Sequence, residues 1–338
     1  MVDSVPVPVG IVIGAIGSGI IGIIGYRFIH VLNRIGTWVL GAGIVLGFGY
    51  IFTHVQTTDF LTRGEFNISG WLATVSLAAL WQIAFAPYVS DYSRYLPADV
   101  PVASTFWATY MGSVLGSSLS FIFGAVAVLA TPVGMDTMDA VKLATGAIGP
   151  LMLVLFLLSV ISHNALNLYG AVLSLITLIQ TFAYRWIPTA KSRALISTVV
   201  LAACAIAAVF ASKDFIGHFV DMVLVLLVVL VPWTAINLID FYAIHKGKYD
   251  IASIFRVDGG IYGRYNPQAL LAYAIGIAVQ IPFMNTPLYV GPISAHLDGA
   301  DLSWIVGLLV TSPLYYWLAS RDSAYKSRMN ESKLVGSV

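Results

Sequence analysis

Long apolar runs recur along the whole chain and constrain its fold more than any other feature. Backbone groups inside a bilayer have no water to bond, so helices and closed barrels are the folds that can cross it. A helix needs about 20 apolar residues to do so. Nine runs approach or exceed that length, at roughly 5–26, 35–53, 70–89, 104–130, 149–181, 194–211, 219–239, 268–285 and 302–319. The sequence therefore predicts an all-α polytopic membrane protein with about nine transmembrane helices.

The composition excludes several other classes of protein. Hydrophobic residues make up 59% of the chain and charged residues 10%, whereas soluble domains are about 25% charged. The net charge of +1 gives no indication of a nucleic-acid partner. Cys204 stands alone in an apolar run, which predicts neither a disulfide nor a thiol metal site. No hydrolase, metalloprotease or nucleotide-binding motif is present, so we expect no catalytic residues, no metal and no bound cofactor.

The basic residues predict the orientation in the membrane. Lys and Arg concentrate in the cytoplasmic loops of membrane proteins. With nine spans, all 17 Lys and Arg residues fall in the loops of one side except Arg63, Lys142 and Lys213. This split predicts a cytoplasmic C-terminal tail at 321–338 and an exterior N-terminus. The basic, aromatic loop at 241–267 is expected to lie along the cytoplasmic interface.

The third span contains a proline followed by polar residues, in the sequence WQIAFAPYVSDYSRYLP. Pro87 has no amide hydrogen and its ring crowds the carbonyl four residues back, so we expect it to act as a hinge. Trp81 and Phe85 offer ring faces on which a planar ligand can stack, and Gln82 can hydrogen-bond to a ring edge. The alternative is that the proline is a packing kink and that the aromatic side chains only fill the core.

Polar side chains also gather in the middle of the fifth span. Ser162, His163, Asn164 and Asn167 follow one another within an otherwise apolar run, and Ser159 precedes them. Polar groups at bilayer depth cost free energy unless they find partners. A planar heterocycle with donors and acceptors is one such partner, because each amide carries both groups. The alternative is that these side chains only join neighbouring helices.

Small residues recur at every fourth position in two spans. This spacing makes a smooth stripe along a helix and lets backbones approach closely. We expect both stripes to be helix contact faces, formed by Gly10, Gly14, Ser18 and Gly22 in the first span and by Gly112, Gly116, Ser120 and Gly124 in the fourth.

Four segments together resemble the nucleobase:cation symporter family, whose bacterial purine-cytosine permeases are the most similar. These segments are FAPYVSDYSRYLP, GSVLGSSLSFIFGA, SHNALNLYGAVLSL and PWTAINLIDFYAIHKGKYDI. The resemblance implies a fold of twelve helices, in which an inverted five-plus-five repeat is followed by two more. The nine spans resemble helices four to twelve of that fold. Residues 1–338 are then expected to form a single, partial transporter domain that lacks the three N-terminal helices.

The resemblance also implies roles for individual residues. It places Trp81 or Gln82, with Phe85 as the other candidate, where the family stacks the base on its sixth helix. It places Asn164 or Asn167 at the polar position of the eighth helix. Sodium-coupled relatives hold their ion at a position that reads Ser159, Ser162 and His163 here. Because imidazole can carry a proton near neutral pH, the histidine favours proton coupling.

The predicted function is therefore secondary active transport, in which a permease of the inner (plasma) membrane takes up cytosine or a purine with a proton or sodium ion. The expected partners are the nucleobase and the lipid bilayer, and the sequence does not indicate an oligomeric state. Three alternatives remain. One is a non-transporting membrane subunit or inactive fragment of such a permease. Another is a permease for a related heterocycle such as allantoin or hydantoin. The third is a membrane-embedded enzyme.

Overall fold

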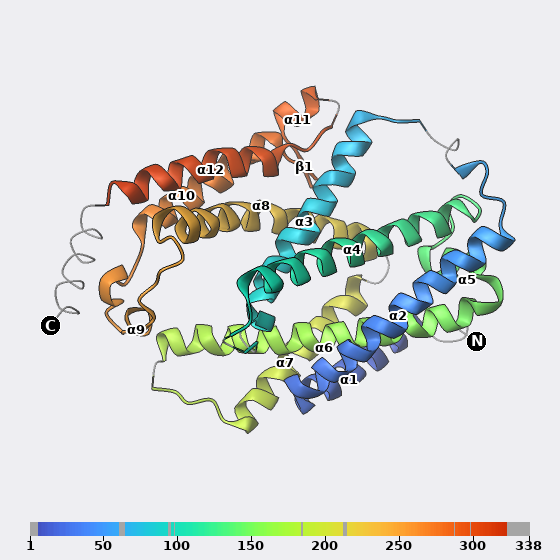
Figure 1. Cartoon of the computed structure of the whole chain (residues 1–338), viewed down its shortest axis with the longest axis horizontal. Coiled ribbons are helices and arrows are strands. Elements are labelled where there is room, and N and C mark those ends of the chain that lie inside the picture. Colours follow the sequence, from blue (N-terminus) through green and yellow to red (C-terminus); the bar gives the residue numbers. More distant parts are fainter. Residues whose placement is uncertain are drawn as a thin grey trace. The chain divides into compact units, whose positions relative to one another are not determined.

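The computed structural model describes residues 6–60, 65–93, 96–97, 99–183, 185–211, 215–286, 288–297 and 299–322. Helices form most of this part of the chain (Figure 1), which confirms the all-α prediction. They group into two compact units. Unit 1 comprises Met1–Glu65 and Tyr88–Phe215, and unit 2 comprises Phe66–Pro87 and Ile216–Val338. The assignment of residues 1–338 to a single transporter domain stays a prediction, and residues 323–338 of the predicted tail lie outside the described part.

Unit 1 is built around its longest helix, α6, which packs against α1, α2, α5 and α7 (Figure 1). Helix α3 contributes its last residues to this unit. The elements of unit 1 are α1 (Val7–Ile24), α2 (Tyr26–His54), α3 (Ile68–Ser93), α4 (Val102–Leu129), α5 (Thr137–Ala144), the 3₁₀ turn η2 (Gly146–Ile148), α6 (Gly149–Phe182) and α7 (Ala190–Ala211).

A single glycine joins α1 to α2. Gly25 has φ +111°, a backbone conformation that favours glycine because it has no Cβ. Helix α2 therefore begins at Tyr26, well before the predicted start at residue 35. The expected loop that carries Arg27 and Arg34 is instead part of the helix. Loop charge locates the side of the membrane but does not mark where a helix begins.

The small-residue stripe of α1 is a helix contact face only in its second half. A Cβ on Gly22 would lie 3.3 Å from the carbonyl oxygen of Ala165 in α6, and Ser18 is buried. No other described residue comes within 4 Å of a Cβ built on Gly10 or Gly14. The same holds for the glycines of the α4 stripe, which have no such contact within unit 1, so the contact face on α4 stays a prediction.

Unit 2 begins with the first part of α3 and continues from α8 to the end of the described chain. Its other elements are α8 (Phe215–Ile239), a π-helical turn (Asp240–Ile244), α9 (Ile251–Ile254), the 3₁₀ turn η5 (Gly260–Tyr262), α10 (Pro267–Ala278), the 3₁₀ turn η6 (Ile281–Phe283), the paired strands β1 (Asn285–Thr286) and β2 (Tyr289–Val290), α11 (Pro292–His296) and α12 (Ser303–Ser320).

Seven helices of the described part are long and apolar enough to cross a membrane. The predicted eighth span, 268–285, is different. Helix α10 has 12 residues, which at about 1.5 Å per residue is shorter than a hydrocarbon core. Pro282 lies in the 3₁₀ turn that follows, where it cannot donate a backbone hydrogen bond. The nine predicted runs all contain helices, but the count of nine crossings stays a prediction.

A buried glutamine repairs the helix at Pro232 in α8. Pro232 has no N–H, so the carbonyl of Val228, four residues back, loses its helical partner. The Nε2 of Gln280 donates to this carbonyl at 2.9 Å and to the carbonyl of Gly276, in the last turn of α10, at 2.8 Å. Gln280 is fully buried. One side chain thus satisfies two backbone acceptors that their own helices leave unpaired.

Two glycines allow the close approach that this repair needs. A Cβ on Gly276 would lie 2.3 Å from Thr311 Oγ1 and 2.8 Å from Pro232 Cβ. A Cβ on Gly307 would lie 2.7 Å from both Gln280 Cδ and Val231 Cγ1. All four distances are below 3.0 Å, so a Cβ at either position would displace its neighbours. Helices α8, α10 and α12 therefore form one closely packed group around Pro232.

We predict that Gln280→Leu destabilises the protein by about 1–3 kcal/mol, because it leaves the Val228 carbonyl buried without a donor. In a Pro232→Ala background the helix supplies that donor itself, so the same substitution is expected to cost about 1 kcal/mol less. Unfolding of the four variants of this cycle in detergent micelles measures the difference. Equal costs in both backgrounds would contradict the repair.

Candidate functional site

The polar residues of α6 divide between two faces of the helix. Ser162 shares a face with Ala165, Leu166 and Tyr169, at spacings of three, four and seven residues. This face is buried against Ile29 of α2 and other apolar side chains of unit 1. Ser162 therefore belongs to the packed core of the unit.

Ser162 is bonded to the neighbouring helix. Its Oγ donates to Oδ1 of Asn33 in α2 at 2.8 Å. A hydrogen bond between two side chains of packed membrane helices is the typical helix-joining contact. The sequence did not indicate Asn33, because the apolar run was expected to begin at residue 35. A signal was nevertheless present, since Asn33 lies only two residues before that run.

The second face is formed by His163, Asn164 and Asn167. Asn167 lies four residues after His163 and three residues after Asn164, so the three side chains share one side of the helix. His163 and Asn164 are exposed in the described structure, and Asn167 is partly buried. The Oδ1 atom of Asn167 is buried and has no hydrogen-bond partner among the described residues. A buried amide oxygen without a donor costs about 1–3 kcal/mol. Ser159, which is partly buried, lies at the edge between the two faces.

In unit 2, one face of α3 is fixed by packing and hydrogen bonds. Leu80 is buried together with Leu227 and Val231 of α8. Four residues before Leu80, Ser76 Oγ accepts a hydrogen bond from Trp304 Nε1 of α12 at 2.9 Å and lies 3.3 Å from the carbonyl oxygen of Asp301, to which it donates. These contacts fix the rotation of α3 about its own axis.

The three candidate residues of α3 lie away from that packed face. Trp81 and Phe85 are four residues apart and Gln82 and Phe85 three, so they share one side of the helix. The Trp81 side chain is 50% exposed, and Gln82 and Phe85 are partly buried. The structure thus places the three candidates of α3 on one face of that helix, and His163, Asn164 and Asn167 on one face of α6. That both sets contact one ligand stays a prediction.

Helix α3 continues through Pro87, the residue at which the sequence predicts a hinge. It is α-helical from Ile68 to Ser93 with the proline inside. A proline removes one hydrogen bond and crowds one carbonyl, which a helix can accommodate by bending. The division between the two compact units nevertheless falls between Pro87 and Tyr88. The role of Pro87 as a hinge stays a prediction.

Comparison with known proteins identifies a family. A family described as permeases for cytosine/purines, uracil, thiamine and allantoin matches residues 6–307. This match includes α3, α6 and α8 with all the candidate residues. No solved structure matches the chain.

Three curated relatives share the similarity. The chain is 34% identical to "Putative purine-cytosine permease YxlA" of Bacillus subtilis, over 88% of the chain and 65% of that protein. It is 24% identical to the purine-cytosine permease fcyB of Emericella nidulans, over 94% of the chain and 64% of the relative. It is also 24% identical to the vitamin B6 transporter TPN1 of Saccharomyces cerevisiae, over 65% of the chain and 41% of the relative. The chain thus spans less than two thirds of the length of these relatives.

We predict that Ser162→Ala and Asn33→Ala each lower stability by about 0.6 kcal/mol, the average for a hydrogen bond between membrane helices. The double variant is expected to lose no more than either single variant, because both remove the same bond. Thermal unfolding of the purified protein measures these changes, with Ser159→Ala as the control on the same helix. Fully additive losses would contradict the assignment of Ser162 to a helix contact.

Proposed function

This chain belongs to the permease family for cytosine/purines, uracil, thiamine and allantoin, and from that membership we propose that it takes up cytosine or a purine together with a cation. The family consists of permeases, so the chain is not an enzyme. The observation that carries the proposal is the match over residues 6–307, which covers nearly all of the described structure. Two relatives, from Bacillus subtilis and Emericella nidulans, are named purine-cytosine permeases.

We assign recognition of the base to α3 and α6. Trp81 and Phe85 would stack on the flat ring, and Gln82 would bond to its edge. Asn164 and Asn167 would supply further donors and acceptors from α6. The buried, unpartnered Oδ1 of Asn167 supports this role, because an N–H group of a base would remove the cost of leaving that oxygen without a donor.

The cation is assigned to the His163 side of α6, and a proton is preferred to sodium. Ser162 is buried and donates to Asn33 of α2, so its hydroxyl lies in the packed core of unit 1 and away from the face that carries His163. His163 is exposed on the face that carries Asn164 and Asn167. Imidazole gains and loses a proton near neutral pH. Ser159 remains the second candidate for contact with the cation.

The remaining parts of the proposal concern the membrane. The distribution of Lys and Arg supports an inner (plasma) membrane protein with a cytoplasmic C-terminus. The boundary between the compact units at Pro87 supports a hinge at that residue. The breadth of the family, which includes allantoin permeases, favours a related heterocycle as the second candidate substrate. A non-transporting membrane subunit or inactive fragment is the other alternative.

We predict that Asn164→Ala and Asn167→Ala each reduce uptake of radiolabelled cytosine or hypoxanthine by about tenfold or more, because each removes a hydrogen bond to the base. The amount of protein in the membrane is expected to remain unchanged. Asn237→Ala is a matched control, since this exposed α8 side chain donates to the Trp233 carbonyl of its own helix.

Cells that express the unaltered chain provide the reference for this experiment. Uptake at the background level of empty cells would contradict transport by this chain and favour the non-transporting alternative. Normal uptake in both asparagine variants, with transport in the unaltered chain, would instead contradict only the assignment of these two residues.

We also predict that a proton gradient, and not a sodium gradient, drives uptake. Replacing external sodium by choline is expected to leave uptake unchanged, whereas a protonophore abolishes accumulation. His163→Gln is expected to remove the stimulation of uptake by external acid, because glutamine cannot carry the proton. Thr177→Ala serves as the control on the same helix, since this exposed hydroxyl donates to the Leu173 carbonyl of α6 itself. A requirement for sodium in the unaltered chain would overturn proton coupling.

A further inference from the structure

Helix α8 ends in a π-helical turn that carries an acidic residue. Asp240 begins this turn, and its backbone carbonyl accepts a hydrogen bond from the N–H of His245, five residues on, at 2.9 Å. The chain then reverses at Lys246 and Gly247, which have φ +52° and φ +71°. Turns with an i to i+5 bond are rare and often lie at functional sites. A left-handed conformation at a lysine also needs support from its surroundings.

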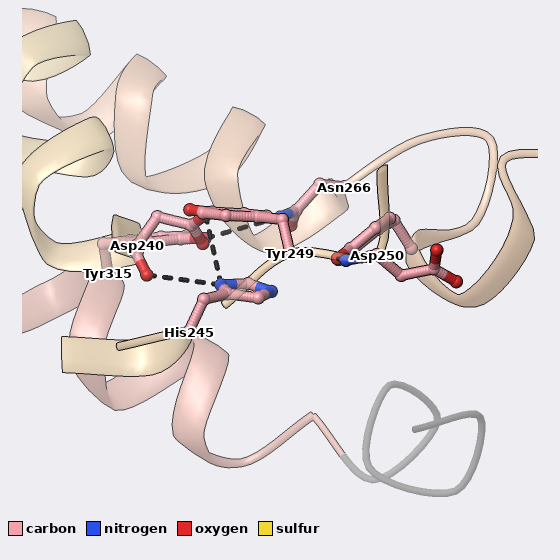
Figure 2. Close-up of polar contacts among 7 residues, drawn as sticks. Asp240, His245, Tyr249, Asp250, Asn266 and Tyr315 are labelled. Atoms are coloured by element: carbon pink, nitrogen blue, oxygen red, sulfur yellow. Dashed lines mark hydrogen bonds and ion pairs between the residues drawn. The ribbon is translucent and has the colours of Figure 1, made fainter. Parts of the chain in front are cut away.

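The Asp240 carboxylate binds side chains from two other segments of unit 2 and from its own turn (Figure 2). Tyr315 Oη of α12 donates to Oδ1 at 2.5 Å, and Tyr249 Oη, from the segment after the reversal, donates to Oδ2 at 2.7 Å. His245 Nδ1 lies 3.2 Å from the same Oδ2. Asn266, which caps the start of α10, places its Nδ2 3.5 Å from Tyr315 Oη.

This arrangement compensates for an unfavourable position of the charge. A carboxylate at the C-terminal end of a helix faces the negative end of the helix dipole, so Asp240 gains nothing from α8 itself. Hydrogen bonds to a charged group are stronger than those between neutral groups. Burial, with the hydrogen bond to Asp240, raises the pKa of Tyr249 above its ordinary value. The phenol therefore keeps its proton and remains a donor.

The segment after the reversal is folded onto the same group. The rings of His245 and Tyr249 stack with centroids 4.6 Å apart and planes at 13°. Tyr262 Oη accepts a hydrogen bond from the backbone N–H of Asp250 at 2.7 Å. Residues 245–262 thus close into one compact loop. The Tyr249 hydroxyl joins this loop to the Asp240 carboxylate by a hydrogen bond.

We propose that Asp240, His245, Tyr249 and Tyr315 form a latch, in which the carboxylate holds the loop 245–262 and α12 against the end of α8 and positions that end during transport. The transport part of this inference rests on the proposed function. The latch joins Asp240 to His245 and Tyr249, which are 5 and 9 residues further along the chain, and to Tyr315, which is 75 residues further. Its opening frees the end of α8, which lies beyond the packed group around Pro232.

A hollow lies beside the latch, and its lining indicates that Asp240 serves the latch and not a ligand site. It has a volume of about 590 Å³ and is lined by Asn237, Asp240, Tyr242 and Tyr249, among others. Asp240 is the charged group of this lining, and both of its carboxylate oxygens already accept hydrogen bonds from tyrosines. The carboxylate is therefore committed to contacts within the protein.

Hydrogen–deuterium exchange of the purified full chain tests the latch directly. Tyr315→Phe removes one hydroxyl from the group, and Tyr249→Phe removes the other. Tyr316→Phe is the matched control, because this neighbouring side chain is 49% exposed and the same change is made one residue away. Asp240→Asn keeps the shape of the side chain and removes its charge.

Exchange of the backbone amides in 245–262 is expected to become about tenfold faster in Tyr315→Phe and Tyr249→Phe, the factor for losing one hydrogen bond to a charged group. Tyr316→Phe is expected to exchange like the unaltered chain. Exchange in both hydroxyl variants that equals the control would overturn the latch. If Asp240→Asn fails to fold, the two tyrosine variants still test the latch.

Uptake kinetics test the part that the latch plays in transport. Tyr315→Phe and Asp240→Asn are expected to change the maximal rate of nucleobase uptake by about threefold or more, with KM unchanged within about twofold, because the base-binding residues are untouched. Changes equal to those of Tyr316→Phe would overturn the positioning role. Background uptake by the unaltered chain would contradict the proposed function, and amide exchange would still decide the latch.

Discussion

The hydrogen bonding of backbone groups in a medium without water is the constraint on which the structure of unit 2 depends. Pro232 leaves one carbonyl of α8 without its helical partner, and Gln280 supplies the missing donor from α10. This bond forms only because Gly276 and Gly307 let the helices come close. A rigid contact between α8, α10 and α12 therefore follows from a single missing N–H group. The short length of α10 fits this arrangement, because α10 ends where the Gln280 side chain reaches the carbonyls of both Val228 and Gly276.

Length and apolar character were sufficient to predict the long helices, because a chain that crosses a bilayer must bond its backbone groups within itself. The limits of α2 and α10 could not be predicted in this way. Arg27 lies inside a helix that begins before the apolar run. Helix α10 ends at Ala278, before Gln280, which bonds to α8, and before Pro282, which has no N–H to donate. Gln280 is visible in the sequence as a lone polar residue in an apolar run. Its partner, a carbonyl 52 residues away, is not.

The polar residues of the candidate site were found from the sequence, but their division between two faces of α6 was not. Ser162 and His163 are neighbours in the chain, yet Ser162 packs toward α2 and His163 lies on the other face. The sequence identifies a cluster of polar residues in α6. Which of these side chains face the core of unit 1 is decided by the packing of Ala165 and Leu166. For Asp240 the sequence showed an acidic residue at the end of a span. Its bond to Tyr315 joins residues that are 75 positions apart.

The polar side chains of the membrane helices differ in whether their buried atoms have a protein partner. The Ser162 hydroxyl and the Gln280 amide nitrogen both have protein partners at hydrogen-bond distance. Asn167 also has a buried polar atom, but this Oδ1 has no such partner in the described structure. If Asn167 served only packing, an apolar residue of the same size would avoid the cost of burying that oxygen. Under the proposed function, the edge of a nucleobase would supply the donor that this oxygen lacks.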